Sequence, residues 1–467
     1  MKYNKLFTWI FAVAILFASV SCEKIVPVDE EDPNGFPGSS EELMMNGPEM
    51  ASVMVSEGEL ARITGMFTNQ FTGSDRQYIA IDNYNVANGD FDNIWTILYV
   101  DGVKQCRLIE AQAEASGKKS YLGQAQIVEA YLIGTATALW GDVPYTQAAN
   151  EADYPNPRFD KQSDVYKSVQ KLLDEGIANT GGDLISTPVY KNDDGITWGQ
   201  LANSLKARFY THTGEYTLAL TSAQSGLTNG DWVANHGTDD DFAAFKDGQF
   251  NLMFAFMVWH REGYMTANGS YLAKILDPSS ADYMGNAKSQ DTARFNYFYL
   301  GAADCWYCDD YDPNYWAGGI YMDNSPYVLM SSAENSLIMA EASNRAGDNT
   351  GAVSFLNDAR NYWDSKLGAD EHQDLVLADF QTGGILNPND VSENDAVLKE
   401  ILLEKYKTCY GQLEAFNDVR RTKNLINIPA KKGTQLPQRF LYPQSEINSN
   451  TSTPSGLGLF TPTEVNQ

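Results

Sequence analysis

The chain has 467 residues, of which 43% are hydrophobic and 20% charged, so it can bury a substantial core and is not a disordered polypeptide. Its 61 acidic residues outnumber 33 basic ones and give a formal net charge of −28. A surface this acidic repels phosphate backbones, which excludes nucleic acid as an expected partner.

The first predicted element is a signal peptide over residues 1–21. Lysines at its start precede the apolar run Leu6–Ala18, which is too short to span a bilayer comfortably, and the small residues of "SVSC" follow. Cys22 directly after them predicts a lipidated cysteine, although Ser19 stands where leucine is usual. The alternative is an ordinary signal peptide followed by a coincidental cysteine. Residues 22–47 predict a polar, lipidated tether, and residues 48–467 a single domain.

Helical periodicity dominates that domain, so we predict a mostly α fold. The long segment "YLGQAQIVEAYLIGTATALWG" is predicted to end at Gly141, a suitable C-terminal cap, and Pro144 prevents its continuation. The next helix is predicted to start from a Ser163 or Asp164 cap.

Two helical segments are broken in the same way, at Thr213–Gly214 and at Gly347–Asp348. A helix, a glycine-polar turn and an alanine-rich helix form the pattern of a tetratricopeptide-like hairpin. The copies are not in tandem, which predicts a superhelical scaffold with long irregular insertions. The largest insertion, about 230–328, has little helical period and is the predicted ligand-binding segment.

Two aromatic and polar loops are the candidate binding sites, because flat rings stack on sugars while amides and carboxylates bind hydroxyls. The first loop lies within Cys305–Gly319 and the second within Thr72–Asp90; both are predicted to be irregular. The alternative for the first loop is that its rings only fix it to the scaffold. The candidate residues are Trp306, Tyr307, Tyr311, Tyr315 and Trp316 in the first loop, and Asp75, Arg76, Tyr78, Asp82 and Tyr84 in the second.

The remaining chemistry is sparse. Cys305 and Cys308 form a CxxC that predicts a local disulfide in an exported protein, since zinc would need two more ligands. Cys106 and Cys409 are predicted to be buried. Asp310, Asp312 and Asn314 match the first half of a calcium loop, but tyrosines replace its glycine and closing glutamate, so only a calcium site of another type remains open. No other metal or cofactor is expected, and neither GxSxG nor HExxH occurs.

Several motifs resemble those of the SusD/RagB family of outer-membrane lipoproteins. They are "ALWGDVPYTQA" from Ala138, "WTILY" from Trp95, "AEASNRAG" from Ala340, "EKYKTCYGQLEAFNDVRRT" from Glu404 and "LPQRFLYPQSEINSN" from Leu436, in the family's order. Two features depart from the family pattern. Phe416 stands at a position where tryptophan is common, and the middle insertion has no motif that aligns.

The resemblance implies a tetratricopeptide-like fold, a place beside a TonB-dependent outer-membrane transporter, capture of nutrients that are usually glycans, and no catalysis. It supports both loops as a site without fixing any residue. The "WGDVPY" stretch itself is predicted to be structural. A glycoside hydrolase with two suitably spaced carboxylates, and a peptide-capturing family member, remain open alternatives.

Overall fold

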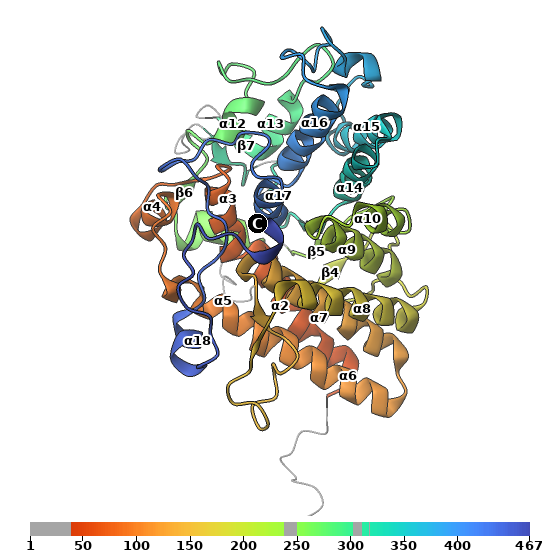
Figure 1. Cartoon of the computed structure of the whole chain (residues 1–467), viewed down its shortest axis with the longest axis vertical. Coiled ribbons are helices and arrows are strands. Elements are labelled where there is room, and N and C mark those ends of the chain that lie inside the picture. Colours follow the sequence, from red (N-terminus) through yellow and green to blue (C-terminus); the bar gives the residue numbers. More distant parts are fainter. Residues whose placement is uncertain (1–38, 238–249, 302–310, 317) are drawn as a thin grey trace, which may run out of the picture. The chain divides into compact units, whose positions relative to one another are not determined.

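The computed structural model describes residues 39–237, 250–301, 311–316 and 318–467. The chain divides into two units, Met1–Leu43 and Met44–Gln467. The predicted signal peptide, Cys22 and most of the predicted tether lie outside the described residues. The described part of the second unit is mostly helical (Figure 1), which confirms the predicted fold class.

A run of helices precedes the insertion. They are α2 (Glu41–Glu57), α3 (Glu59–Phe67), α4 (Arg76–Asp82), η2 (Asn88–Phe91), α5 (Asp92–Thr96), the π-helical η3 (Ile97–Val103), α6 (Lys104–Ser116), α7 (Lys119–Trp140), α8 (Gln162–Thr180), α9 (Trp198–His212) and α10 (Tyr216–Ala223). A second run follows the insertion: α14 (Ser332–Arg345), α15 (Asn349–Leu367), η5 (Leu377–Phe380), α16 (Glu393–Thr408), α17 (Leu413–Arg421), α18 (Gln444–Ser449) and η6 (Glu464–Asn466).

Consecutive helices pack against one another, as in a solenoid. Helices α6 to α10 each contact the next in chain order, α10 contacts α14 across the insertion, and α14 and α15 both contact α16. Both predicted breaks are confirmed: Gly214 (φ 75°) and Gly347 (φ 85°) adopt the left-handed backbone that glycine tolerates at a helix end. The tetratricopeptide-like scaffold is therefore present.

Helix α7 lies at the centre of this array, because it packs against α6, α8 and α9 and is buried on all sides over most of its length. Its Gly134 permits close packing. A Cβ atom there would lie 2.2 Å from the ring of Phe209 on α9, so a larger residue would displace that ring.

The insertion leaves and rejoins the scaffold at one place. Strand β5 (Trp232–Ala234) at its start pairs antiparallel with β9 (Tyr327–Met330) at its end, with Val233 opposite Val328, and β4 (Tyr190–Lys191) pairs with the other edge of β5. The start and the end of the predicted insertion therefore lie side by side in this small sheet.

The interior of the insertion contains only short helices and strands in its described residues. Its described residues contain α11 (Leu252–Phe254), the π-helical η4 (Ala255–His260), β6 (Met265–Thr266), α12 (Tyr271–Leu276), α13 (Thr292–Phe298), β7 (Tyr299–Leu300) and β8 (Asp312–Pro313). These helices have no more than seven residues, too few to display an amphipathic period, which explains the weak helical pattern of this part of the sequence.

Three predictions of local structure were wrong. The Thr72–Asp90 segment is not an irregular loop, since it contains β1 (Thr72–Gly73), α4 and η2. The first described helix begins at Glu41, so the last residues of the predicted 22–47 tether are helical, with Pro48 inside α2. Helix α8 begins after Lys161, whose side chain makes no cap hydrogen bond, rather than from Ser163 or Asp164.

The stretch Trp140–Tyr145, here called the α7 junction, is structural as predicted. The Trp140 ring is fully buried, lies edge-on to Trp95 with ring centroids 5.3 Å apart, and donates from Nε1 to the Leu441 carbonyl at 2.8 Å. Gly141 ends the helix with φ 86°. The chain then leaves as β2 (Val143–Pro144), paired with β3 (Phe159–Asp160).

A cluster of charged side chains contacts the C-terminal end of this junction, at Tyr145. Arg107 donates from Nη2 to the Tyr145 carbonyl at 2.9 Å and from Nε to Glu129 at 3.0 Å. Burial and the adjacent Glu129 carboxylate raise the pKa of Glu110 to about 9. One side chain therefore joins α6, α7 and the junction, beside a glutamic acid that keeps its proton at neutral pH.

Two remaining predictions concern cysteines and membrane segments. Cys106 and Cys409 are free, buried thiols, as predicted. Cys305 and Cys308 lie outside the described residues. None of the described helices is long and apolar enough to cross a membrane.

Candidate ligand-binding face

Strand pairing brings the two predicted loop regions together. β1 pairs antiparallel with β6 of the insertion, with Thr72 opposite Thr266 and Gly73 opposite Met265. The Ser74 amide adds a hydrogen bond to the Tyr264 carbonyl at 2.9 Å. Helix α4, which follows β1, therefore lies beside the insertion (Figure 1).

Aromatic rings and guanidinium groups gather where α4 meets the insertion. The guanidinium carbon of Arg76 lies 5.6 Å from the Tyr264 ring centroid, and that of Arg261 lies 5.8 Å from the same centroid. Trp259 is half-buried and lies edge-on to Phe254 at 4.9 Å. We call Arg76, Arg261 and Tyr264, together with Trp259 two residues before Arg261, the aromatic–arginine face.

A buried layer supports this face from below. The Tyr78 hydroxyl accepts a hydrogen bond from Arg62 Nε at 2.8 Å, and the Arg62 guanidinium lies 4.1 Å from the ring centroid of buried Phe256. Tyr78 packs on Phe256 at 5.0 Å and is only 2% exposed, and burial raises its pKa. The prediction of Tyr78 as a ligand contact is therefore wrong, because its ring face is covered by protein.

Asp82 and Tyr84 are likewise used within the protein. Lys431 Nζ contacts the Asp82 carboxylate, which also accepts from the Gly73 amide at 3.0 Å. The Tyr84 hydroxyl accepts from the Lys431 amide at 2.9 Å, and burial raises the pKa of Tyr84 to about 12. Both side chains therefore hold the C-terminal segment against α4, and their role as ligand contacts stays a prediction.

Asp75 and Arg76 remain available for a ligand. Their side chains are 54% and 71% exposed, and Asp75 caps α4 by accepting from the Arg76 amide at 2.9 Å. Arg76 adopts φ 47°, a left-handed backbone that residues other than glycine seldom adopt and that often occurs at functional sites.

The other predicted loop is described only in part, since Trp306 and Tyr307 lie outside the described residues. Tyr311 is half-buried: its hydroxyl donates to Asp277 and its carbonyl accepts from the Ala267 amide at 3.0 Å, directly after β6. Tyr315 is half-buried against Leu300. Trp316 is 50% exposed, so it is the predicted ring of the described residues most open to solvent.

The half-matched calcium motif receives no support from Asn314. Its side-chain oxygen accepts from the Trp316 amide at 3.0 Å, and its amide nitrogen donates to the Asn296 carbonyl at 2.8 Å, so this residue orders the turn. Asp310 lies outside the described residues. Within the described ranges, no group of three His, Cys, Asp or Glu side chains is arranged to hold a metal ion.

Sequence analysis missed Trp259, Arg261 and Tyr264. Their stretch "WHREGY" has the right composition, with two aromatic residues and an arginine within six positions. Nothing in that stretch indicates that it pairs with Thr72–Gly73, which lies far away along the chain.

Comparison with known proteins connects this fold to a family. A family model described as "SusD-like_2: Starch-binding associating with outer membrane" matches residues 42–443. A SusD homolog from Parabacteroides distasonis is 16% identical with a TM-score of 0.70, over 92% of this chain and 98% of that one. A SusD homolog from Bacteroides uniformis is 19% identical with a TM-score of 0.66, over 91% and 99%.

A chitin-binding protein of known structure is 17% identical, with a TM-score of 0.62, over 88% of this chain and 94% of that chain. No curated protein sequence matches significantly. At these identities the solved structures establish the fold, and the family model, which spans most of the chain, confirms the resemblance found in the motifs. The chain belongs to the SusD-like family, whose members are described as starch-binding and as associating with the outer membrane.

Proposed function

We propose that this protein captures oligosaccharides at the cell surface and delivers them to a partner TonB-dependent transporter, without catalysing a reaction. The observation that carries the proposal is the aromatic–arginine face, which β1–β6 pairing holds together on a scaffold of a glycan-binding family. Trp316, half exposed, is the proposed second stacking ring.

The chemistry of the face suits a sugar. The apolar ring of Trp259 in the face, and that of Trp316 outside it, can stack on the C–H side of a pyranose ring. Arg76 and Arg261 can donate hydrogen bonds to hydroxyl oxygens. Cation–π contacts with Tyr264 and the strand pairing hold Arg76 and Arg261 in place before a ligand arrives, which reduces the entropy lost on binding.

The proposed attachment is a lipid on Cys22 after removal of residues 1–21. Because α2 begins at Glu41, the polar tether is shorter than the predicted 22–47 segment. In cells fed a labelled fatty acid, we expect label on the wild-type protein and none on Cys22→Ser. Labelling of both would show that this cysteine is not the attachment site. Co-purification with a TonB-dependent transporter from outer membranes tests the partner.

Calorimetry with purified protein, starting at Glu23, and a panel of plant and host glycans tests capture. We expect one glycan class to bind, and Trp316→Ala and Arg76→Ala each to weaken binding about 10-fold, the effect of losing one ring or one charged donor. Tyr154→Ala is the matched control, because that ring is 41% exposed and outside the face.

The other outcomes separate the alternatives. Binding of peptides but of no glycan would replace the proposal with peptide capture. Release of new reducing ends from a bound oligosaccharide would indicate a hydrolase. Equal affinity in wild type, Trp316→Ala and Arg76→Ala would place the glycan site elsewhere on the molecule.

A further inference from the structure

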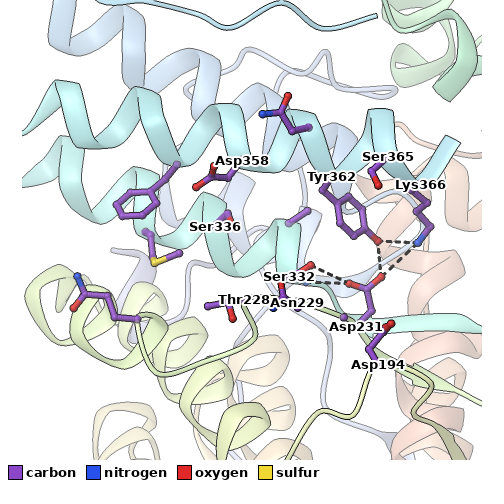
Figure 2. A pocket seen from close by; sticks show the side chains of 16 residues that line it. Asp194, Thr228, Asn229, Asp231, Ser332, Ser336, Asp358, Tyr362, Ser365 and Lys366 are labelled. Atoms are coloured by element: carbon purple, nitrogen blue, oxygen red, sulfur yellow. Dashed lines mark hydrogen bonds and ion pairs between the residues drawn. The ribbon is translucent and has the colours of Figure 1, made fainter. Parts of the chain in front are cut away.

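A concave region lies on the helical scaffold, apart from the aromatic–arginine face. It has a volume of about 810 Å³ and is bounded by α15, the first turns of α14, the turn before β5 and the segment after β4 (Figure 2). We call it the α14–α15 cleft. Its size falls within the range of pockets that enclose small ligands, about 300–1,000 Å³. It contains no residue of the aromatic–arginine face, and α14 and α15 lie across the array from α4 and β6 (Figure 1).

A network of hydrogen bonds fixes the floor of the cleft around Asp231. The carboxylate of Asp231 accepts from the Tyr362 hydroxyl at 2.5 Å and from the Ser332 amide at 3.0 Å, and Lys366 Nζ lies 3.5 Å away (Figure 2). Lys366 also donates to the Tyr362 hydroxyl at 2.8 Å. The charges of Asp231 and Lys366 are thus paired with each other, and the side chains of the floor are held in place before a ligand binds.

The rim offers acceptors that remain unused. Asp194 and Asp358 are exposed and make no hydrogen bond or ion pair among the described residues, and partial burial together with nearby Asp374 raises the pKa of Asp358. Neutral amides and hydroxyls make up most of the remaining polar rim: Gln224, Thr228, Asn229, Ser336, Asn361 and Ser365.

This lining selects against acidic ligands. Three carboxylates line the cleft, and Lys366, the sole cation among its lining residues, is occupied by Asp231. Carboxylates only accept hydrogen bonds, so they favour a ligand rich in donors and repel one that carries acidic groups. Phe355 supplies an apolar wall.

A narrower recess adjoins the cleft, since Tyr362 and Lys366 line both. The recess has about 20 Å³, which is room for one water or one hydroxyl group. Its Tyr321 is 1% exposed, and the Tyr321 hydroxyl has no hydrogen-bond partner within the described residues. A buried hydroxyl without a partner indicates that a water or a ligand hydroxyl completes it.

We infer that the α14–α15 cleft is a second ligand site, which takes a saccharide unit without acidic groups through acceptors of Asp194 and Asp358 and the wall of Phe355. The saccharide class rests on the proposed function, whereas the location and the exclusion of acidic sugars rest on the cleft alone.

Ser365→Trp on α15 tests the site, because the added ring would fill the cleft. Ser354→Trp is the matched control, since Ser354 is exposed on the same helix but does not line the cleft. We expect Ser365→Trp and Asp358→Asn each to weaken one of two binding events by about 10-fold or more. Ser354→Trp should bind as wild type does.

Hydrogen exchange locates each event. Neutral oligosaccharides should protect amides of residues 332–345 and 355–367 in wild type and in Arg76→Ala, but not in Ser365→Trp. A uronic-acid oligosaccharide should leave those amides unprotected until Asp194 and Asp358 are both changed to Asn.

Unchanged binding and protection in Ser365→Trp would overturn the second site while leaving the proposed function intact. Protection at the cleft alone, unaffected by Arg76→Ala, would support the second site and contradict the face. Failure of every saccharide to bind wild type would overturn both, and equal protection by acidic sugars would overturn the proposed selectivity.

Discussion

The α7 junction and the aromatic–arginine face are opposites in exposure and in sequence signal. Trp140 of the junction is fully buried, while the Arg76 side chain of the face is 71% exposed. The junction combines a glycine in a left-handed turn, a proline and a packed ring, so local backbone constraints dictate its sequence. The face joins residues that have no local relationship. In this protein the most recognisable motif therefore marks scaffold, and the proposed binding surface lies in unremarkable sequence.

The largest expected effect belongs to the junction. Trp140→Ala removes a fully buried ring and the partner of the Leu441 carbonyl, and should lower the free energy of unfolding by about 3–5 kcal/mol. Urea unfolding measures the loss, and calorimetry on the folded fraction should give the wild-type glycan affinity. A stable Trp140→Ala protein with weakened glycan binding would contradict this assignment, because it would make the α7 junction a binding region and not a structural one.

The charge cluster beside the junction predicts an intermediate effect that depends on pH. The pKa of Glu110 is raised to about 9 in the folded protein, so the folded state holds a proton that the unfolded state releases above its ordinary pKa. This stability is fully present at low pH and is lost as pH rises towards 9. Between pH 6 and 9 the free energy of unfolding should fall on the order of 2–4 kcal/mol further in the wild type than in Glu110→Gln.

Thermal or urea unfolding across that pH range measures the difference, since glutamine stays neutral throughout. Parallel pH profiles for the two proteins would contradict a protonated Glu110. The glycan affinity of Glu110→Gln should equal that of wild type, because Glu110 belongs to the charge cluster beside the α7 junction and not to the aromatic–arginine face.

The smallest effect on stability is expected at the face. Trp259→Ala should weaken glycan binding about 10-fold by removing a stacking ring, and should lower the free energy of unfolding by less than Trp140→Ala does, because Trp259 is only half-buried. Calorimetry and urea unfolding on the same samples check both. An equal loss of stability without loss of affinity would make Trp259 a packing residue.

The candidate site shows how far local reasoning extends. Composition predicts Arg76 and Trp316, which are exposed, but it equally predicts Tyr78, which is buried. Composition cannot separate these cases, because the ring of Tyr78 is covered by Phe256 and Tyr264, which lie in the distant insertion. A segment of seven residues such as α4 carries too short a period to reveal which of its sides is buried.

The sequence alone determined the helical scaffold, its two glycine breaks and the structural role of Trp140–Pro144, because 3.6-residue periodicity, left-handed glycines and proline act on neighbouring residues. The tertiary structure decided which exposed groups meet. The pairing of Thr72 with Thr266 builds the aromatic–arginine face, and the contact of Asp231 with Tyr362 forms the floor of the α14–α15 cleft. Both contacts join residues far apart in the chain. The free energy that selects them comes from packing of the whole domain, and no short stretch of sequence determines that packing.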